Sequence, residues 1–198
     1  MELDAAIRRR RMCRDFSDRP VPPAVVDRLI DRARRAPSAG DTQGWSFLVL
    51  EGTEQTARFW QTDADAAWLA DPDHPGLLAA PVIVAVFCSR RAYVERYSRP
   101  DKGGADPGAW SAPYWFVDAA FATMLLLLGA EEEGLGALLF RLHGEVPRLR
   151  AAFGVPDEWD PVGAVALGWP GDRGGAGAAR RPRRRRLPAG EVVHRGGW

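Results

Sequence analysis

The stretch APYWFVDAAFATMLLLLGA, residues 112–130, is nearly apolar throughout and decides the fold. Pro113 and Asp118 interrupt its first half, and the unbroken apolar run after Asp118 is far shorter than the roughly 20 residues that a bilayer-spanning helix requires. A helix that is apolar on every side belongs in the core of a protein. We therefore expect residues 112–130 to form a helix buried on all sides at the centre of one domain, with no membrane span.

Along the sequence, the expected helices and strands alternate both before and after this helix. The strand expected at 81–89 is a continuous apolar run, which is typical of a strand buried on both faces. Residues 90–111, rich in Arg, Gly, Pro and Tyr, show no periodicity and are expected to form a loop. The other expected elements are helices at 3–11, 22–38, 56–70 and 146–154 and strands at 45–52, 136–142 and 161–169. Four strands among four or five helices predict an α+β or α/β sandwich.

Composition excludes several classes of protein. The 198 residues suffice for one domain, 1–198, of which 180–198 is a basic tail. With 27 basic and 26 acidic residues, the formal net charge of +1 gives no overall field that would attract nucleic acid or a membrane surface. Cys13, Cys88 and three scattered histidines predict neither a disulfide framework nor a metal site. The start of the sequence lacks the apolar region of a signal peptide, so we expect a cytoplasmic protein.

Two clusters of arginine lie near the two ends of the sequence, RRRRMCRDF at 8–16 and RRPRRRRLP at 180–188. Each could be a solvated basic patch. Alternatively, both could bind one phosphate group, because guanidinium groups bind phosphate oxygens in pairs and a dianion requires more than one of them. Sequence order alone does not distinguish these two interpretations.

Three stretches taken together resemble the nitroreductase family of FMN-dependent oxidoreductases. They are RRRRMCRDFSDRPVP at 8–22, APSAGDTQGWSFLVL at 36–50 and GLGALLF at 134–140, followed by a basic pair before Leu187 and Pro188. In this order and spacing they cover nearly the whole chain. The resemblance implies an α+β, three-layer sandwich in which helices flank a central mixed, mainly antiparallel sheet of four to five strands.

The resemblance also implies that the anion is the phosphate of FMN. We expect Arg14 to lie near flavin N1 and O2, where a cation favours the reduced flavin. Met12 stands where the family often has serine, and loss of that hydroxyl removes one phosphate donor. The residues that match the family's phosphate-binding positions are Arg10, Arg11, Met12, Arg14, Arg184 and Arg186.

Two further segments match flavin-contacting positions of the family. In the first, small residues let the backbone approach the ribityl chain and the ring edge; its candidates are Pro37, Ser38, Ala39, Asp41 and Gln43. Asp41 stands where the family often has asparagine, and an ionised carboxylate cannot donate a hydrogen bond and repels a reduced, anionic ring. In the second, the backbone faces flavin N5 in relatives, and Phe140 and Arg141 are the candidates. Alternatively, Phe140 is a core residue and Arg141 a surface charge.

The implied reaction is hydride transfer in two halves. NADH or NADPH delivers hydride to flavin N5, and a flat acceptor such as a nitroaromatic or a quinone then takes it, which gives ping-pong kinetics. No side chain is assigned as an obligatory acid or base. Trp110, Tyr114 and Trp115 in segment 90–115 are candidates for stacking on the acceptor, although they suit packing against a partner subunit equally well. The family forms intertwined homodimers in which each flavin contacts both chains, so a homodimer is implied here.

Other functions stay open at this stage. Related proteins oxidise azoline rings, remove halogens reductively or fragment the flavin, and a non-catalytic flavin-binding or deazaflavin-binding protein is a further alternative. A nucleic-acid-binding protein that uses the RRPRRRR tail is a third hypothesis, but the chain offers no groove-reading element or stacking platform. The sequence does not distinguish NADH from NADPH, nor does it identify the physiological acceptor.

Overall fold

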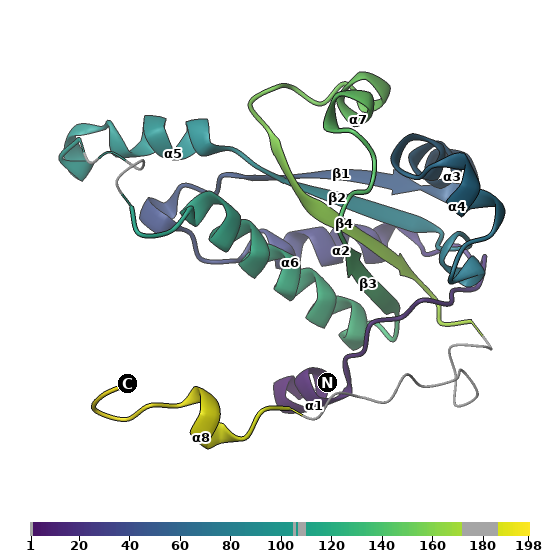
Figure 1. Ribbon diagram of the computed structural model, residues 1–198, viewed down its shortest axis with the longest axis horizontal. Coiled ribbons are helices and arrows are strands. Elements are labelled where there is room, and N and C mark those ends of the chain that lie inside the picture. Colours follow the sequence, from purple (N-terminus) through teal and green to yellow (C-terminus); the bar gives the residue numbers. More distant parts are fainter. Residues whose placement is uncertain (1, 105, 107–109, 172–185) are drawn as a thin grey trace.

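The computed structural model describes residues 2–104, 106, 110–171 and 186–198 (Figure 1). Its helices and strands alternate largely as expected. In chain order they are α1 (Leu3–Arg9), α2 (Pro23–Ala33), a 3₁₀ turn (Ala39–Asp41), β1 (Trp45–Glu51), α3 (Gly52–Asp63), α4 (Ala66–Ala70), a 3₁₀ turn (Pro75–Leu77), β2 (Val82–Cys88), α5 (Arg90–Tyr97), a 3₁₀ turn (Pro100–Lys102), α6 (Tyr114–Glu132), β3 (Gly136–Phe140), α7 (Val146–Phe153), β4 (Asp160–Gly168) and α8 (Ala189–Val192).

The four strands form one sheet in the order β1-β2-β4-β3. All three pairings are antiparallel. An isolated parallel bridge joins Met12 to Ala137 of the edge strand β3, and this bridge is the parallel component of the expected mixed sheet. The predicted α+β fold is therefore confirmed.

Two helix layers cover the two faces of the sheet, and β2 shows why. Every residue of β2 is buried. Because alternate side chains of a strand point to opposite faces, this burial means that both faces of the sheet are covered. Val82, Val84 and Val86 pack into the core formed with α2 and α6, whereas Ile83 and Ala85 pack into the core formed with α3 and α7. Figure 1 shows α2 and α6 on one side of the sheet and α3 and α7 on the other, which confirms the predicted three-layer sandwich.

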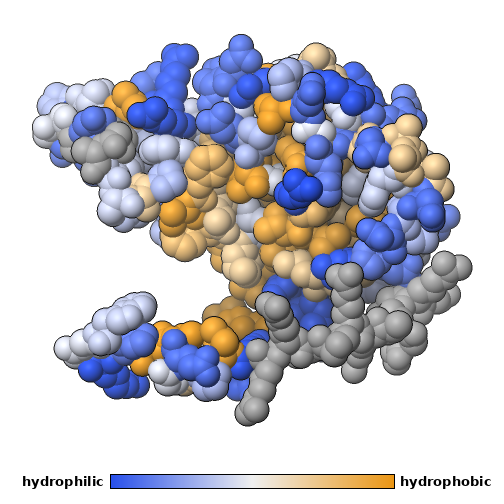
Figure 2. Space-filling view, viewed as in Figure 1, coloured by the Kyte–Doolittle hydropathy of each residue, from blue (hydrophilic) through white to orange (hydrophobic). Residues whose placement is uncertain are grey.

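The long apolar helix α6 is not buried on all sides in a single chain, contrary to expectation. Ala122 and Leu126 are fully buried against the sheet, but Phe121 and Met124 on the opposite side are 47% and 46% exposed. Figure 2 shows apolar surface where Figure 1 places α6. Among the described residues, one helix, α6, is long and apolar enough to cross a membrane. Core helices of soluble proteins also meet this criterion of length and composition. Its apolar face is therefore available to cover another surface.

Residues 90–111 are not a plain loop, because Arg90–Tyr97 form α5. The hydroxyl of Ser89 caps this helix by accepting a hydrogen bond from the N–H of Ala92 at 3.2 Å. Tyr93 is the one residue of α5 that is buried. A helix that buries a single side chain has almost no apolar periodicity, which is why the sequence pattern did not predict it.

The described C-terminal segment, 186–198, contains α8 and extends away from the sheet (Figure 1, yellow). Every residue in it is exposed. Arg186 is therefore exposed, whereas Arg184 lies outside the described residues. Whether the two arginine clusters converge on one phosphate stays a prediction.

Candidate active site

The N-terminal arginine cluster lies beside the start of β3. The N–H of Cys13 donates to the carbonyl of Ala137 at 2.9 Å, next to the bridge from Met12. Arg10 is half-buried, and its Nη1 is buried without a hydrogen-bond partner among the described residues. Because a desolvated guanidinium N–H without an acceptor is costly, such an atom suits an anion-binding position.

The other predicted phosphate-binding residues of this cluster differ in their environment. Arg11 uses Nη1 to donate to the carbonyls of Arg9 and Arg10 at 3.0 and 2.8 Å, so its guanidinium caps the end of α1. Arg14 is exposed, and Met12 is half-buried against both cores. Arg10 is thus the arginine of this cluster whose geometry is most suited to a phosphate.

Loop 37–44, which joins α2 to β1, is folded on itself. The N–H of Asp41 donates to the carbonyl of Ser38 at 3.0 Å, and the N–H of Gln43 donates to the hydroxyl of Ser38 at 2.9 Å. The side-chain amide of Gln43 also donates to the carboxylate of Asp41 at 3.0 Å. Asp41 and Gln43 are exposed. The loop therefore presents a bonded pair of polar side chains instead of a row of free backbone amides.

A buried carboxylate that the sequence analysis did not select holds this loop. Asp118, on the first turns of α6, accepts a hydrogen bond from the N–H of Ala39 at 2.8 Å and another from the hydroxyl of Tyr93 at 2.7 Å. Asp118 is 3% exposed. The signal in the sequence was the charge of Asp118 inside an apolar stretch, which we interpreted only as an argument against a membrane span.

The second predicted flavin-contacting segment begins where β3 ends. The ring of Phe140 stacks on Trp60 with 5.3 Å between centroids and meets Phe59 edge to face at 6.2 Å. Arg141 is exposed. The side chain of Phe140 is therefore a core residue, as the alternative interpretation expected, and a flavin contact here would involve the backbone or Arg141.

Asp63, at the end of α3, holds the backbone that follows Phe140. One of its carboxylate oxygens, Oδ1, accepts hydrogen bonds from the N–H groups of His143 and Gly144 at 3.0 and 3.1 Å. The other oxygen is buried without a partner among the described residues. Burial raises the pKa of Asp63 above the ordinary value of 3.8, although the hydrogen bonds from Gly144 and His143 act in the opposite direction.

The raised pKa of Asp63 predicts a specific pH dependence of stability. The folded protein holds the proton of Asp63 more tightly than the unfolded chain, so this stabilisation is present below about pH 4 and is lost as the pH rises through the raised pKa. Asp63→Asn removes the titration and keeps an oxygen that can accept both N–H groups. Relative to wild type, we expect the free energy of unfolding of Asp63→Asn to increase from about pH 4 to pH 7 in urea titrations.

A difference between Asp63→Asn and wild type that stays constant with pH would contradict the raised pKa of Asp63.

The three aromatic residues predicted to contact substrate lie in one cluster with α5. Trp110 meets Tyr97 edge to face at 4.5 Å between centroids and Tyr114 at 5.4 Å. Trp115 meets the ring of Tyr93 at 6.4 Å. Trp110 and Trp115 are half-buried and Tyr114 is 37% exposed. The structure thus brings these residues together, and their contact with a substrate stays a prediction.

The predicted flavin-contacting residues of one chain form two groups at opposite ends of α6. Loop 37–44 is bound at Asp118, near the start of the helix. The arginine cluster is joined to its end, where Arg9 pairs with Glu131 at 3.2 Å. Asp118 and Glu131 are separated by about 20 Å along the helix axis. The second segment, after Phe140, follows β3, and Ala137 of this strand is bridged to Met12 of the arginine cluster.

These features define a three-layer α+β sandwich with an arginine cluster beside the edge strand β3 of its sheet. The chain belongs to the nitroreductase family, whose model matches residues 7–169. This finding confirms the resemblance that the sequence motifs indicated.

The relatives described next match this chain over most of its length, but at low sequence identity. A "Putative NADH dehydrogenase/NAD(P)H nitroreductase" of Methanothermobacter thermautotrophicus is 29% identical over 178 residues, which cover 88% of this chain and 81% of the relative. A 5,6-dimethylbenzimidazole synthase of Rhodospirillum rubrum is 29% identical over 181 residues, 85% of this chain and 82% of the relative. A "putative nitroreductase in complex with FMN" from Exiguobacterium sibiricum has the same fold, with a TM-score of 0.74 at 20% identity over 98% of this chain and 97% of the other.

Proposed function

We propose that the chain is an FMN-dependent oxidoreductase that takes hydride from NADH or NADPH and passes it to a small flat acceptor, such as a nitroaromatic or a quinone. Family membership, the name of the archaeal relative and the FMN complex of a structural neighbour support the flavin and the nicotinamide nucleotide. FMN supplies the hydride chemistry when bound, and the protein contributes binding and orientation. The acceptor, the single domain over 1–198 and a cytoplasmic location are proposals from the sequence.

The observation that carries this proposal is the buried Nη1 of Arg10, which has no hydrogen-bond partner among the described residues. It fits the phosphate of FMN, because a phosphate oxygen would give this N–H a charged acceptor. Arg10 would hold the phosphate, Arg14 would lie near flavin N1 and O2, and the second arginine cluster would add further cations. Loop 37–44 and the backbone after Phe140 would contact the ribityl chain and the ring.

We also propose that the complete site forms only in a homodimer. Within one chain, loop 37–44 and the arginine cluster lie at opposite ends of α6, about 20 Å apart along the helix. The exposed apolar face of α6 is suited to pair with a second copy of the chain, since exposed apolar patches on soluble proteins mark interaction sites. Pairing would let the loop of one chain approach the arginine cluster of the other.

The visible absorbance spectrum of the purified protein tests the proposed function. We expect a yellow protein whose flavin bands bleach when NADH or NADPH is added without oxygen and return on addition of menadione or a nitroaromatic. A protein that stays colourless and does not bind added FMN would contradict the proposal. Colour that neither nucleotide bleaches would instead support a non-catalytic flavin-binding or deazaflavin-linked protein.

The alternative is different chemistry on the same fold. The relative from Rhodospirillum rubrum is named as a synthase and matches this chain at the same identity as the archaeal relative. Two measurements separate the reductase from an enzyme that consumes its flavin: turnover of NADH or NADPH with each acceptor, and the amount of intact FMN that remains afterwards. A reductase keeps its FMN intact, whereas the alternative enzyme loses it.

A further inference from the structure

Loop 37–44 has an unusual backbone that other elements must hold in place. Gly40, Asp41 and Gln43 have φ values of 65°, 53° and 53°, so three of four consecutive residues are in the left-handed region. Side chains with a Cβ are disfavoured there, and Asp41 and Gln43 both carry one. Such conformations persist only where the surroundings determine them.

Asp118 connects the loop to two helices through one oxygen. Its Oδ2 accepts the N–H of Ala39 at 2.8 Å and the hydroxyl of Tyr93 at 2.7 Å, so α6, α5 and loop 37–44 meet at this atom. Tyr93 is fully buried. Burial, together with the hydrogen bond to Asp118, raises the pKa of Tyr93, so its hydroxyl keeps its proton and remains a donor.

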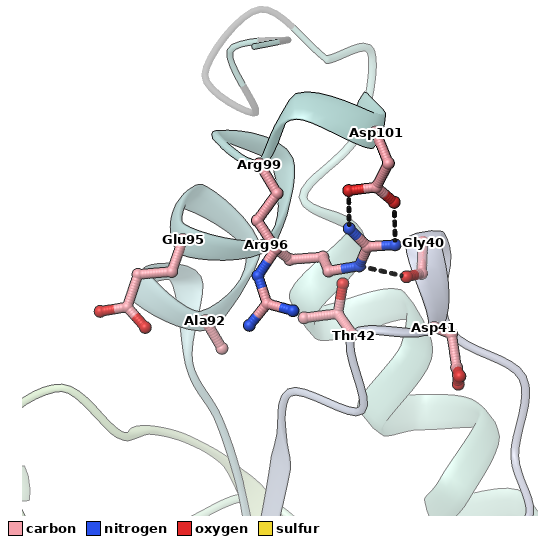
Figure 3. Close-up of a pocket in the computed structure, with 8 residues that line it drawn as sticks. All are labelled: Gly40, Asp41, Thr42, Ala92, Glu95, Arg96, Arg99 and Asp101. Carbon is pink, nitrogen blue, oxygen red and sulfur yellow. Dashed lines mark hydrogen bonds and ion pairs between the residues drawn. The ribbon is translucent and has the colours of Figure 1, made fainter. Parts of the chain in front are cut away.

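Helix α5 contacts the loop at two more places. The Nε of Arg96 donates to the carbonyl of Gly40 at 2.8 Å, while its two other nitrogens bind both carboxylate oxygens of Asp101 (Figure 3). The ring of Tyr93 lies so close to Gly44 that a Cβ at this position would come within 2.4 Å of it. The residue at 44 must therefore be glycine for Tyr93 to reach Asp118.

We propose that Asp118 and Tyr93 are positioning residues that fix loop 37–44 in its flavin-binding conformation. Both side chains are buried, so they act through the N–H of Ala39 and not through contact with solvent or ligand. This proposal rests on the proposed function, because the loop matters for affinity only where it contacts FMN. It assigns α5 to the support of the flavin-binding loop, where the sequence had suggested only a loop without periodicity.

Two substitutions at Asp118 and one matched control test this role. Asp118→Ala leaves the N–H of Ala39 and the hydroxyl of Tyr93 without an acceptor, and we expect the dissociation constant for FMN to rise about tenfold. Asp118→Asn keeps an oxygen that can accept both bonds and should restore most of the affinity. The control is Thr123→Val, on the same helix and equally buried, whose hydroxyl, among the described residues, donates within α6 to the carbonyl of Ala119. It should lower stability and leave the dissociation constant unchanged.

Hydrogen exchange of the Ala39 amide in the flavin-free protein gives a readout that does not depend on FMN. We expect slow exchange in wild type and Thr123→Val and exchange about tenfold faster in Asp118→Ala. Unchanged exchange and unchanged FMN affinity in Asp118→Ala would overturn the proposal, as would an equal loss of affinity in Thr123→Val. If wild type did not bind FMN, the proposed function would fail, while the exchange rates would still decide whether Asp118 holds the loop.

Discussion

Arg10→Gln is expected to raise the dissociation constant for FMN about tenfold to a hundredfold. The Nη1 of Arg10 is buried without an acceptor among the described residues, so a phosphate bound there would gain a charge-assisted hydrogen bond. Such a bond contributes about 1.5 to 3 kcal/mol, which corresponds to this range. Quenching of flavin fluorescence, on titration of the flavin-free protein, measures the effect.

Riboflavin, which lacks the phosphate, serves as the discriminating ligand for this prediction. Its affinity should be the same for wild type and Arg10→Gln. Arg8→Gln is the control variant, because Arg8 belongs to the same cluster but is exposed and, within the described part of the chain, pairs with Asp4, one helical turn away. An equal loss of riboflavin affinity would show that Arg10 acts on the ring, and an unchanged FMN affinity would show that the phosphate binds elsewhere.

The strands were predictable from the sequence because their signal is local. β2 is a continuous apolar run, and the structure buries each of its side chains on one face of the sheet or the other. The two arginine clusters and loop 37–44 were likewise visible as motifs. Glycine, proline and charged residues flank each of these segments, so the limits of the segments could be recognised from the sequence alone.

The support of the candidate site was not predictable in the same way. Asp118 and Asp63 are single carboxylates whose role depends on backbone N–H groups 79 and 80 residues away. Helix α5 buries only Tyr93 and is otherwise stabilised by its cap and by ion pairs such as Arg91 with Glu95, which leave no apolar period. A pattern that is read along the chain cannot report such distant partners.

The distance between the two groups of flavin-contacting residues was also not available from sequence order. This distance arises because the two groups are bound at opposite ends of one long helix, loop 37–44 at Asp118 and the arginine cluster at Glu131. The same helix exposes an apolar face, which contradicts the expectation of complete burial within one chain. Both findings have a common explanation if α6 pairs with a second copy, and this explanation can be tested directly.

The double variant Phe121→Asp and Met124→Asp is expected to be a folded monomer that binds FMN about a hundredfold more weakly than wild type, a change of about 2.7 kcal/mol. Phe121 and Met124 are nearly half exposed in the single chain, so carboxylates there remain solvated and should cost the monomer little. In a dimer interface the same carboxylates would be desolvated without partners, which is strongly unfavourable. A monomer could then not bring loop 37–44 and the arginine cluster to one FMN.

Light scattering after gel filtration gives the molar mass, circular dichroism reports the fold, and FMN titration gives the affinity. Val94→Asp is the matched control, since Val94 is 44% exposed on α5 and does not belong to the apolar face of α6. We expect it to remain a dimer with wild-type affinity for FMN. If the double variant stayed dimeric, α6 would not be the interface, and if it became a monomer that bound FMN as tightly as wild type, one chain would form the complete site.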